Sequence, residues 1–201
     1  MQRLEATRER IERFLHRLGQ VFRGNGRLYL VGGSLMVFQG YRPVTQDLDY
    51  TVHLVAGDDQ DFTSAVRQVQ REINLNIERA SPGDFIPLPH GWQERSPFLG
   101  RYGGLEVFAF DPLTTVLSKI ERGLERDIAD ALALLRAGQF TLAELTDAFE
   151  EIVPRLEREA VPRVQERDFR RKLAAFINLA KSYDTARTTE QTVQQEQGDN
   201  P

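Results

Sequence analysis

The sequence predicts an α+β protein, in which a small mixed β-sheet core with flanking helices is followed by a C-terminal helical bundle. Up to residue 111, short apolar runs bounded by glycine and proline alternate with amphipathic segments, a pattern typical of mixed strands and helices. Over residues 112–185, apolar residues recur at helical spacing, and over 186–201 they are nearly absent. We therefore expect a core over residues 1–111, a helical region over 112–185 and a disordered tail over 186–201.

Composition limits the classes of function. The 201 residues include no cysteine, which excludes disulfides and thiolate metal sites. A net charge of −4 disfavours a globally basic nucleic-acid binder. The charged N-terminus lacks the apolar stretch of a signal peptide, and no apolar run approaches the length of a membrane span. We therefore expect a cytoplasmic protein without a membrane partner.

The first half is expected to alternate helices with buried strands. Apolar residues recur at helical spacing near the N-terminus, continuous apolar runs follow, and turns rich in glycine or proline separate them. The expected elements are, in order, a helix over 3–22, a strand over 28–31, a helix over 34–39, a strand over 47–55, a helix over 61–72 and a strand over 76–79.

A proline- and glycine-rich stretch over 81–104 follows, and it holds the only tryptophan, Trp92. Its composition predicts loops with an edge strand near Phe85. Trp92 either pins this stretch to the core or stacks on a nucleobase. Residues 105–110 are strongly strand-like, and Asp111 then precedes a proline at the first helical position, which is typical of a helix start.

The second half is expected to be helical. Apolar residues at helical spacing cover 112–122 and 125–137, with Gly123 between the two segments. A capping-box pattern beginning at Thr141 predicts the start of another helix. Residues 155–182 carry one or two further helices with interleaved charges of both signs, which indicates a solvated surface.

The most informative feature is a glycine–serine turn followed by two aspartates. Gly33 and Ser34 end one apolar run, and Asp47 and Asp49 begin the next after a spacer of twelve residues. Alternate strand residues share a face, so both carboxylates would point the same way and suit a hard cation such as Mg²⁺. A helix start at the turn would offer backbone N–H groups to a phosphate. The combination predicts a site for a metal-bound nucleoside triphosphate, whereas the aspartates alone could be solvated acids at a sheet edge.

The order of strand, glycine–serine turn, helix and acidic strand resembles the nucleotidyltransferase superfamily of DNA polymerase β, in its minimal bacterial form. Residues 40–49 are also similar to the Arg-x-x-Thr-x-Asp-x-Asp variant of toxin-like members such as the AbiEii-type toxins. Further along, Lys119 with Asp127 and Asp130 resembles the Lys…Asp-x-x-Asp helical segment of that group. The two matches cover residues 28–55 and 105–138.

The resemblance implies roles for individual residues. The nucleotide-binding residues would be Gly32, Gly33, Ser34, Arg42 and Lys119. The metal ligands, for Mg²⁺ or Mn²⁺, would be Asp47, Asp49 and a third carboxylate on a neighbouring strand, for which Glu106 is the candidate and Glu78 and Asp84 are alternatives. Asp47, Asp49, Glu106, Lys119 and Asp127 would form the catalytic set. Without the resemblance, Arg42 is equally a solvated turn residue, and Lys119 a lysine on a helix surface.

The resemblance implies a metal-dependent nucleotidyltransferase that moves a nucleoside monophosphate from an NTP to a hydroxyl acceptor. The acceptor would be an RNA 3′ end, such as that of tRNA, or a protein side chain. A cognate antitoxin protein would be a partner if the setting is a toxin–antitoxin or phage-defence system. The alternative is a catalytically inactive nucleotidyltransferase-fold binding module that acts through a protein partner. A sugar transferase that holds a nucleotide–sugar with Asp-x-Asp is a more remote alternative.

Overall fold

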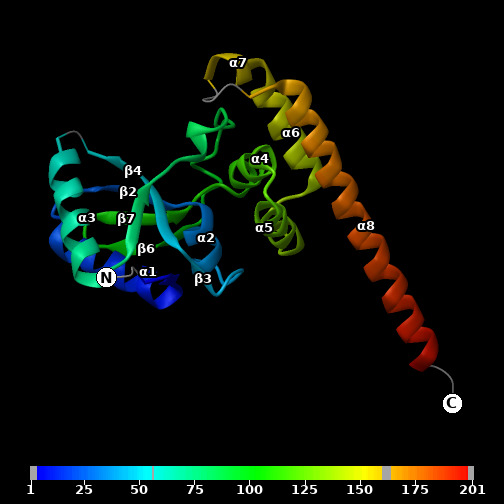
Figure 1. The fold of residues 1–201 in the computed structure, drawn as a ribbon, viewed down its shortest axis with the longest axis horizontal. Coiled ribbons are helices and arrows are strands. Elements are labelled where there is room, and N and C mark those ends of the chain that lie inside the picture. The colour runs from blue at the N-terminus through cyan, green and yellow to red at the C-terminus, as the bar shows by residue number, and fades with distance from the viewer. Residues whose placement is uncertain (1–3, 56, 160–163, 199–201) are drawn as a thin grey trace.

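The computed structural model describes residues 4–55, 57–159 and 164–198, with side chains described as far as residue 183. It confirms the predicted α+β class: a five-stranded mixed sheet with flanking helices precedes a layer of helices (Figure 1). The strands lie in the order β5-β4-β2-β7-β6. Their bounds are β2 Gly26–Leu30, β4 Asp47–Leu54, β5 Asn76–Arg79, β6 Phe98–Tyr102 and β7 Leu105–Ala109.

The register of the sheet determines which polar residues meet. β4 runs antiparallel to β2, with Leu30 opposite Tyr50, and parallel to β5, with Asp49 opposite Glu78. β7 runs parallel to β2 on its other side, and β6 is the antiparallel edge strand. Asp49 and Glu78 therefore lie side by side on one face of the sheet.

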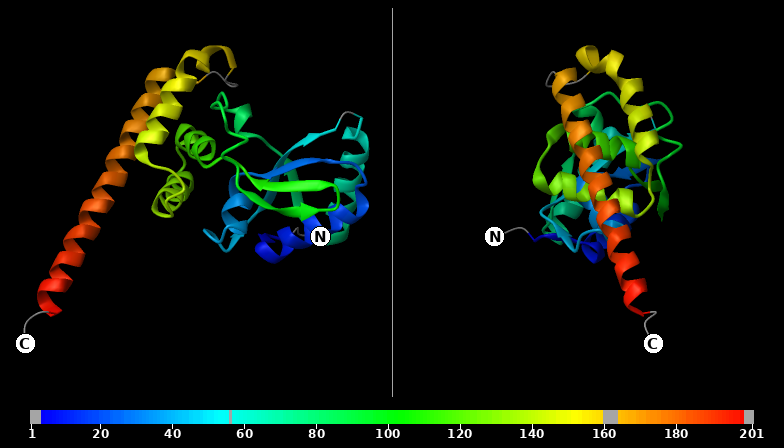
Figure 2. Two further views of the ribbon diagram at one scale, coloured as in Figure 1. Left: turned by 180° about the vertical axis from the view of Figure 1, so that it is seen from behind. Right: turned by 90° about the vertical axis from the view of Figure 1, so that its right-hand side faces the viewer.

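Two amphipathic helices cover the opposite face, α1 (Arg8–Val21) and α3 (Asp59–Ile73) (Figure 2). The Thr7 side chain caps the N-terminus of α1. Phe62 of α3 meets Tyr50 of β4 and Phe22 edge-on, with ring centroids 5.9 and 5.2 Å apart. The apolar face of the sheet and the apolar stripes of the two helices thus form one buried core.

Aromatic side chains cover much of the face that carries the aspartates. Trp92 stacks on Phe110 with centroids 4.6 Å apart, and Tyr29 stacks on Phe108 at 5.3 Å. Trp92 was expected either to pin the proline-rich stretch to the core or to stack on a nucleobase. In the structure its ring pins that stretch to the sheet.

The helical layer consists of α4 (Pro112–Arg122), α5 (Glu125–Arg136), α6 (Leu142–Ile152), α7 (Leu156–Glu159) and α8 (Glu166–Gly198). The Asp111 side chain caps α4, and Thr141 forms the predicted capping box at α6. Gly123 separates α4 from α5 in the left-handed conformation, φ +70°, which favours glycine. Phe149 of α6 meets Phe169 of α8 edge-on, with ring centroids 4.9 Å apart, which joins these two helices.

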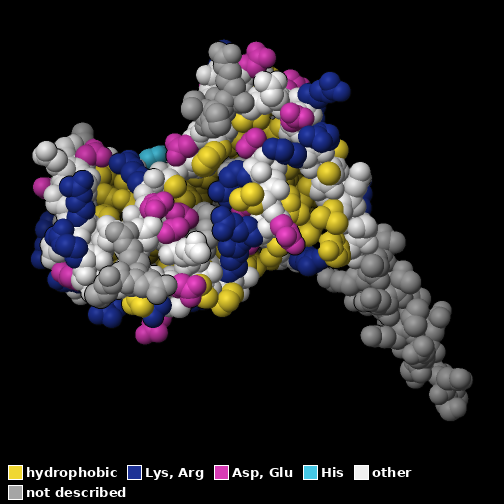
Figure 3. Space-filling view, in the orientation of Figure 1, with side chains coloured by type: hydrophobic (Ala, Val, Ile, Leu, Met, Phe, Trp, Pro, Cys, Tyr) yellow, Lys and Arg dark blue, Asp and Glu magenta, His cyan; other side chains and the backbone are white. Residues whose placement is uncertain are grey.

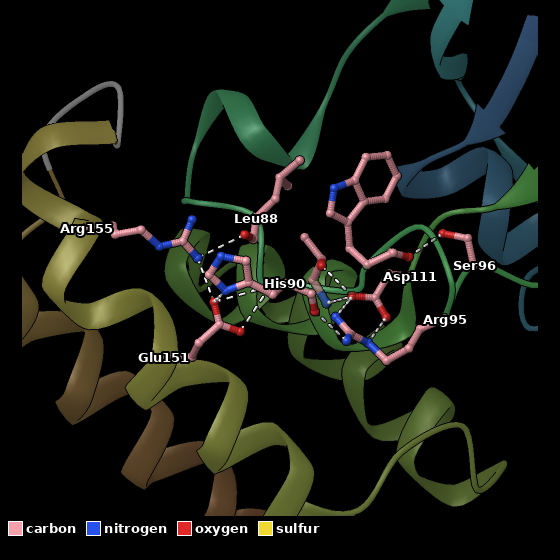
Figure 4. Close-up of polar contacts among 9 residues, drawn as sticks. Leu88, His90, Arg95, Ser96, Asp111, Glu151 and Arg155 are labelled. Atoms are coloured by element: carbon pink, nitrogen blue, oxygen red, sulfur yellow. Dashed lines mark hydrogen bonds and ion pairs between the residues drawn. The ribbon is translucent and has the colours of Figure 1, made fainter.

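Polar contacts hold the stretch between β5 and β6 against the helices (Figure 4). The contacts are Arg155 to the Leu88 carbonyl (3.0 Å), the His90 N–H to Glu151 (3.0 Å) and Arg95 to both carboxylate oxygens of Asp111 (2.9 Å each). Asp111 is completely buried, so its paired, charge-assisted bonds to Arg95 are strong. This proline-rich stretch is therefore fixed at several points.

The structure differs from the sequence-based expectation in three respects. Near Phe85 the chain forms a 3₁₀ turn, Pro82–Asp84, in which the Asp84 side chain completes a capping box, and the edge strand is β6 instead. Two short strands that were not expected, Ala6–Thr7 (β1) and Val44–Thr45 (β3), pair with each other. α8 continues to Gly198 where a disordered tail was expected, because glutamine and glutamate readily extend a helix that is already formed.

No helix in the described ranges combines the length and the apolar character that crossing a membrane requires.

Candidate functional site

A buried serine joins the two predicted aspartates to the helix before them, α2 (Gly32–Phe38). Asp47 and Asp49 lie on the same face of β4, as their spacing predicts. The Asp49 backbone N–H donates to Ser34 Oγ (2.6 Å), and the Ser34 hydroxyl donates to the Asp47 carbonyl oxygen (3.4 Å). Because Ser34 is fully buried, its hydroxyl positions β4 and is not available to a phosphate. This corrects the phosphate-binding role expected for that side chain.

Replacing Ser34 with Ala is expected to lower the free energy of unfolding by about 1–3 kcal/mol, because the Asp49 N–H loses its acceptor at a buried position. Urea denaturation followed by circular dichroism measures the change. Ser64→Ala is the control, since Ser64 is exposed on α3 and donates only to the Gln60 carbonyl; its expected change is within about 0.5 kcal/mol. Equal stabilities of the two variants would contradict the positioning role.

Gly32 and Gly33 bring the first turn of α2 against the acidic strand. Gly32 has φ +55°, and a Cβ on it would lie 3.0 Å from Asp49 Oδ2. A Cβ on Gly33 would overlap the Thr45 side chain. Both positions therefore require glycine, and the close approach places backbone groups of α2 at the edge of the cavity described below.

Negative charge is concentrated at the start of β4. Burial, followed by the charges of Asp47 and Glu78, raises the pKa of Asp49 from 3.8 to about 6. The Arg122 charge and the Gly33 backbone N–H favour the ionised form without cancelling this rise. A bound cation would relieve the repulsion.

Glu78 is the carboxylate that the fold brings beside the aspartates. It lies opposite Asp49 in the pairing of β4 with β5. The Asn76 side-chain amide donates to Asp47 Oδ1 and to Glu78 Oε1, at 2.6 Å each. Asn76 therefore fixes the two carboxylates relative to each other. The sequence analysis did not anticipate Asn76, although its strand spacing from Glu78 placed both on one face.

Glu106 lies at the far end of the sheet. It is paired in register with Arg27, which lies opposite His53 rather than Asp49. Glu106 lies on the same face of the sheet as the aspartates, but on a strand two places from β4. Its position along the sheet is level with His53, four residues after Asp49. Its carboxylate pairs with Arg101 (2.5 Å) and Arg27 (3.5 Å). The expectation that Glu106 stands beside the aspartates is therefore wrong, because neither the strand order nor the register is encoded locally.

A basic wall from α4 and α5 faces the carboxylates. The buried Lys119 donates from Nζ to Asp127 Oδ1 (3.2 Å) and Asp130 Oδ2 (2.5 Å). Arg122 donates to the same oxygen of Asp127 (2.7 Å), whereas Asp127 Oδ2 is buried without a partner among the described residues. The predicted lysine and aspartates thus meet across the break at Gly123. The two aspartates orient the cations, and Asp127 also lines the first lobe of the cavity described below.

Arg42 connects the turn before β4 to α5. Its Nε donates to Asp130 Oδ1 (2.6 Å), and its NH2 group donates to the Arg126 carbonyl (3.2 Å). Only 24% of its side chain is exposed. Arg42 is therefore an anchored residue of the site wall and not a solvated turn arginine.

The acidic and basic walls enclose a cavity with two adjoining lobes. The first lobe, about 300 Å³, adjoins α2 and includes Gly33, Arg42 and Thr45. The second lobe, about 270 Å³, includes Glu78 and Phe85. The residues that line both lobes are Gly32, Asp47, Asp49, Lys119, Arg122 and Arg126. Figure 3 shows acidic and basic side chains gathered on either side of the hollow between the sheet and the helical layer.

The donor atoms at the acidic wall fit a hard divalent cation. Among the described residues, no three acidic or histidine side chains form a ready-made ligand set. Asp47 and Asp49 line both lobes of the cavity. Mg²⁺ usually takes one or two protein carboxylates and completes its octahedron with phosphates and water, so this pair is sufficient for a metal that arrives with a nucleotide.

Comparison with known proteins gives one match. A family model described as "Nucleotidyltransferase of unknown function (DUF6036)" matches residues 9–183. The matched range includes the sheet, both walls of the cavity and most of the helical layer. Neither the curated proteins nor the solved structures include a match to the chain.

Proposed function

Because the chain belongs to the DUF6036 family of nucleotidyltransferases, we propose that it moves a nucleoside monophosphate from an NTP to a hydroxyl acceptor. The observation that carries this proposal is the cavity in which Asp47 and Asp49 face Lys119 and Arg122. Carboxylates suit Mg²⁺ or Mn²⁺, and lysine and arginine suit phosphate oxygens. An NTP bound with its cation matches both walls at once.

We assign the triphosphate to the first lobe. Asp47 and Asp49 would hold Mg²⁺ or Mn²⁺, and the bound metal would offset the charge of the phosphate oxygens. Lys119 and Arg122 face the same space, and Asp127 orients both of them. The glycine turn at the start of α2 leaves room for phosphates to approach the backbone.

The proposed reaction is an in-line substitution at the α-phosphorus. The acceptor oxygen forms a bond to this phosphorus, the bond from the phosphorus to the α–β bridging oxygen breaks, and pyrophosphate leaves. The proton of the acceptor hydroxyl passes to a carboxylate, and Glu78 is the best placed because it lies opposite Asp49 in the sheet. The acceptor is an RNA 3′ end, such as that of tRNA, or a protein side chain.

A transfer assay tests the proposal. The protein is incubated with each α-labelled NTP, Mg²⁺ or Mn²⁺, and either total tRNA or protein acceptors, and the label on the acceptor is measured. We expect transfer by the wild type and its loss in Asp47→Asn. The absence of transfer from every NTP to every acceptor, or equal transfer by Asp47→Asn, would overturn the proposed function.

Replacing Glu78 with Gln is expected to lower the rate of transfer by about 10²- to 10⁴-fold, the usual contribution of a positioned acid or base. The affinity for inorganic tripolyphosphate should change little, since Glu78 lies outside the first lobe. Glu106→Gln is the matched control and should leave the rate unchanged, because Glu106 lies at the other end of the sheet. A greater loss in the Glu106 variant would contradict the assignment of Glu78.

The contact of Asn76 with both Asp47 and Glu78 favours one alternative, a nucleotidyltransferase-fold module that binds NTP without transferring it and acts through a protein partner. Calorimetry with NTP and Mg²⁺ separates the two: binding without turnover supports this alternative, and turnover rejects it. If the protein shares the biological role of the AbiEii-type toxins that its sequence resembles, the partner is a cognate antitoxin in a toxin–antitoxin or phage-defence system. Co-expression with the product of the neighbouring gene tests that partner.

A further inference from the structure

We propose that the second lobe is a nucleobase pocket, in which the base of the incoming NTP stacks on Phe85 and hydrogen-bonds to the Thr115 hydroxyl. This inference rests on the proposed function and adds to it the position of the base and the residues that select it. Three observations carry it: the size and chemistry of the lobe, an unpaired hydroxyl, and an aromatic ring held in place by its loop.

The second lobe suits a planar, uncharged group. A cavity of about 150 Å³ is enough to bind benzene, so the volume of about 270 Å³ here admits a purine or a pyrimidine. The cations that line the lobe, Lys119, Arg122 and Arg126, also line the first lobe and so stand at the border between the two. Apart from Glu78, the residues that belong to the second lobe alone are uncharged. Phosphates therefore fit the first lobe and a base fits the second.

Thr115 lines this lobe, and its hydroxyl is unsatisfied. The residue is 3% exposed, and its Oγ1 has no hydrogen-bond partner among the described residues. Its neighbour Thr114 occupies the same first turn of α4, but the Thr114 hydroxyl donates to Asp111 (2.5 Å). A buried hydroxyl without a partner destabilises the fold, unless a ligand or water supplies the bond. The edge of a nucleobase carries both donors and acceptors, so it can supply that bond.

Phe85 provides a face on which a base can stack. The ring follows the capped turn Pro82–Asp84 and packs partly against the core. The Arg122 guanidinium carbon lies 5.9 Å from the ring centroid, so a base on this ring would lie next to a cation of the phosphate site. Contacts further along the same stretch fix it to α6 and to Asp111 (Figure 4). The stacking face is therefore in place before a ligand arrives, which favours binding.

The chemistry of the lobe favours a base over the acceptor strand. A polynucleotide acceptor needs a track of cations along its phosphates. The residues beyond the shared border include Pro82, Phe85, Thr115 and Ser118, none of which can neutralise a phosphate. An acceptor strand therefore does not lie along this lobe, and only its terminal hydroxyl needs to reach Glu78, which lies opposite Asp49.

Calorimetry with non-hydrolysable ligands tests the proposal. The ligands are the four NTP analogues with a methylene bridge between the α and β phosphorus atoms, and inorganic tripolyphosphate, all with Mg²⁺. We expect at least one analogue to bind the wild type about tenfold or more tightly than tripolyphosphate, since stacking and one hydrogen bond are added. Thr115→Val and Phe85→Ala should weaken the binding of that analogue about five- to thirtyfold and leave the binding of tripolyphosphate unchanged. Thr115→Val should also change the ranking of the four bases.

Matched variants separate ligand binding from folding. Thr115→Ser keeps the hydroxyl and should bind like the wild type, and Phe85→Tyr keeps the ring face. Thr115→Val should melt at the same temperature as the wild type or higher, because it removes an unpaired buried hydroxyl. If every analogue binds no more tightly than tripolyphosphate, or if the valine and serine variants weaken binding equally, the nucleobase pocket is overturned.

The same experiment distinguishes this inference from the proposed function. If tripolyphosphate with Mg²⁺ does not bind, the assignment of the first lobe fails. The four nucleosides without phosphate then test the second lobe by itself, using saturation-transfer NMR. Binding of a nucleoside that Thr115→Val weakens supports the base pocket, and the absence of binding by all four overturns it.

Discussion

Replacing Asp49 with Asn is expected to stabilise the metal-free protein while it lowers nucleotidyl transfer at least about a thousandfold. In the folded protein the pKa of Asp49 is about 6, against an ordinary value of 3.8. The folded state therefore binds a proton more tightly than the unfolded state, so stability falls as the pH rises from about 4 to about 6. Above that range the charged Asp49 destabilises the fold by about 1–3 kcal/mol, after allowance for its partial exposure. Asparagine carries no charge and removes this penalty.

Urea denaturation in EDTA at pH 4 and at pH 7.5 measures the effect. The free energy of unfolding of Asp49→Asn should exceed that of the wild type by the whole expected amount at pH 7.5. The difference should be close to zero at pH 4, where Asp49 is protonated in the folded state. Mg²⁺ should raise the melting temperature of the wild type, because ligands that bind the folded state stabilise it, and should have little effect on the variant. A variant that is less stable than the wild type at pH 7.5 would contradict the proposed charge repulsion.

Replacing Lys119 with Met is expected to lower the free energy of unfolding by about 3–5 kcal/mol, because it removes the cation that two buried carboxylates share. Each carboxylate then keeps a single arginine, Arg122 for Asp127 and Arg42 for Asp130. Lys119 Nζ lies 3.2 Å from Asp127 and 2.5 Å from Asp130, and all three residues are buried. The methionine side chain fills similar space, so the loss reports charge and not volume. Guanidinium denaturation at pH 7.5 measures it.

Arg171→Met is the matched control for this prediction. Arg171 pairs with Asp168 on the surface of α8 with 77% of its side chain exposed. Its removal should change stability by less than about 1 kcal/mol, the usual upper value for exposed pairs. In a Lys119→Met variant that remains folded, binding of tripolyphosphate with Mg²⁺ should also fall. A loss of stability no larger than in the control would show that the Lys119 pairs are not buried in solution.

Much of the fold follows from local patterns. The strand over 76–79, the helix over 112–122 and the capping box at Thr141 have the predicted bounds or contacts, because capping and periodicity act between residues close in the chain. The β1–β3 pair and the edge strand β6 were not predicted. The β1–β3 pair depends on partners distant in the sequence. β6, in contrast, forms a hairpin with β7 across Gly103 and Gly104, a local turn signal that the sequence analysis did not use.

The candidate site was likewise predicted only in part. Asp47 and Asp49 share a face because successive strand residues alternate, and that follows from their spacing alone. Ser34 was placed correctly beside them, but its hydroxyl bonds to the backbone of β4 and not toward the cavity. Burial decides this difference, and burial depends on the packing of α2 against β4.

The sequence by itself determined the class of the fold, the aspartate pair on one strand face, and the grouping of Lys119 before Gly123 with Asp127 and Asp130 after it. Only the tertiary structure decided which carboxylate joins the pair. Glu78 and Glu106 lie on equally plausible strands, and both point to the face of the aspartates. The order β5-β4-β2-β7-β6 places Glu78 next to Asp49 and Glu106 two strands away. Strand order is set by the burial of the whole sheet against α1 and α3, so a single strand does not encode it.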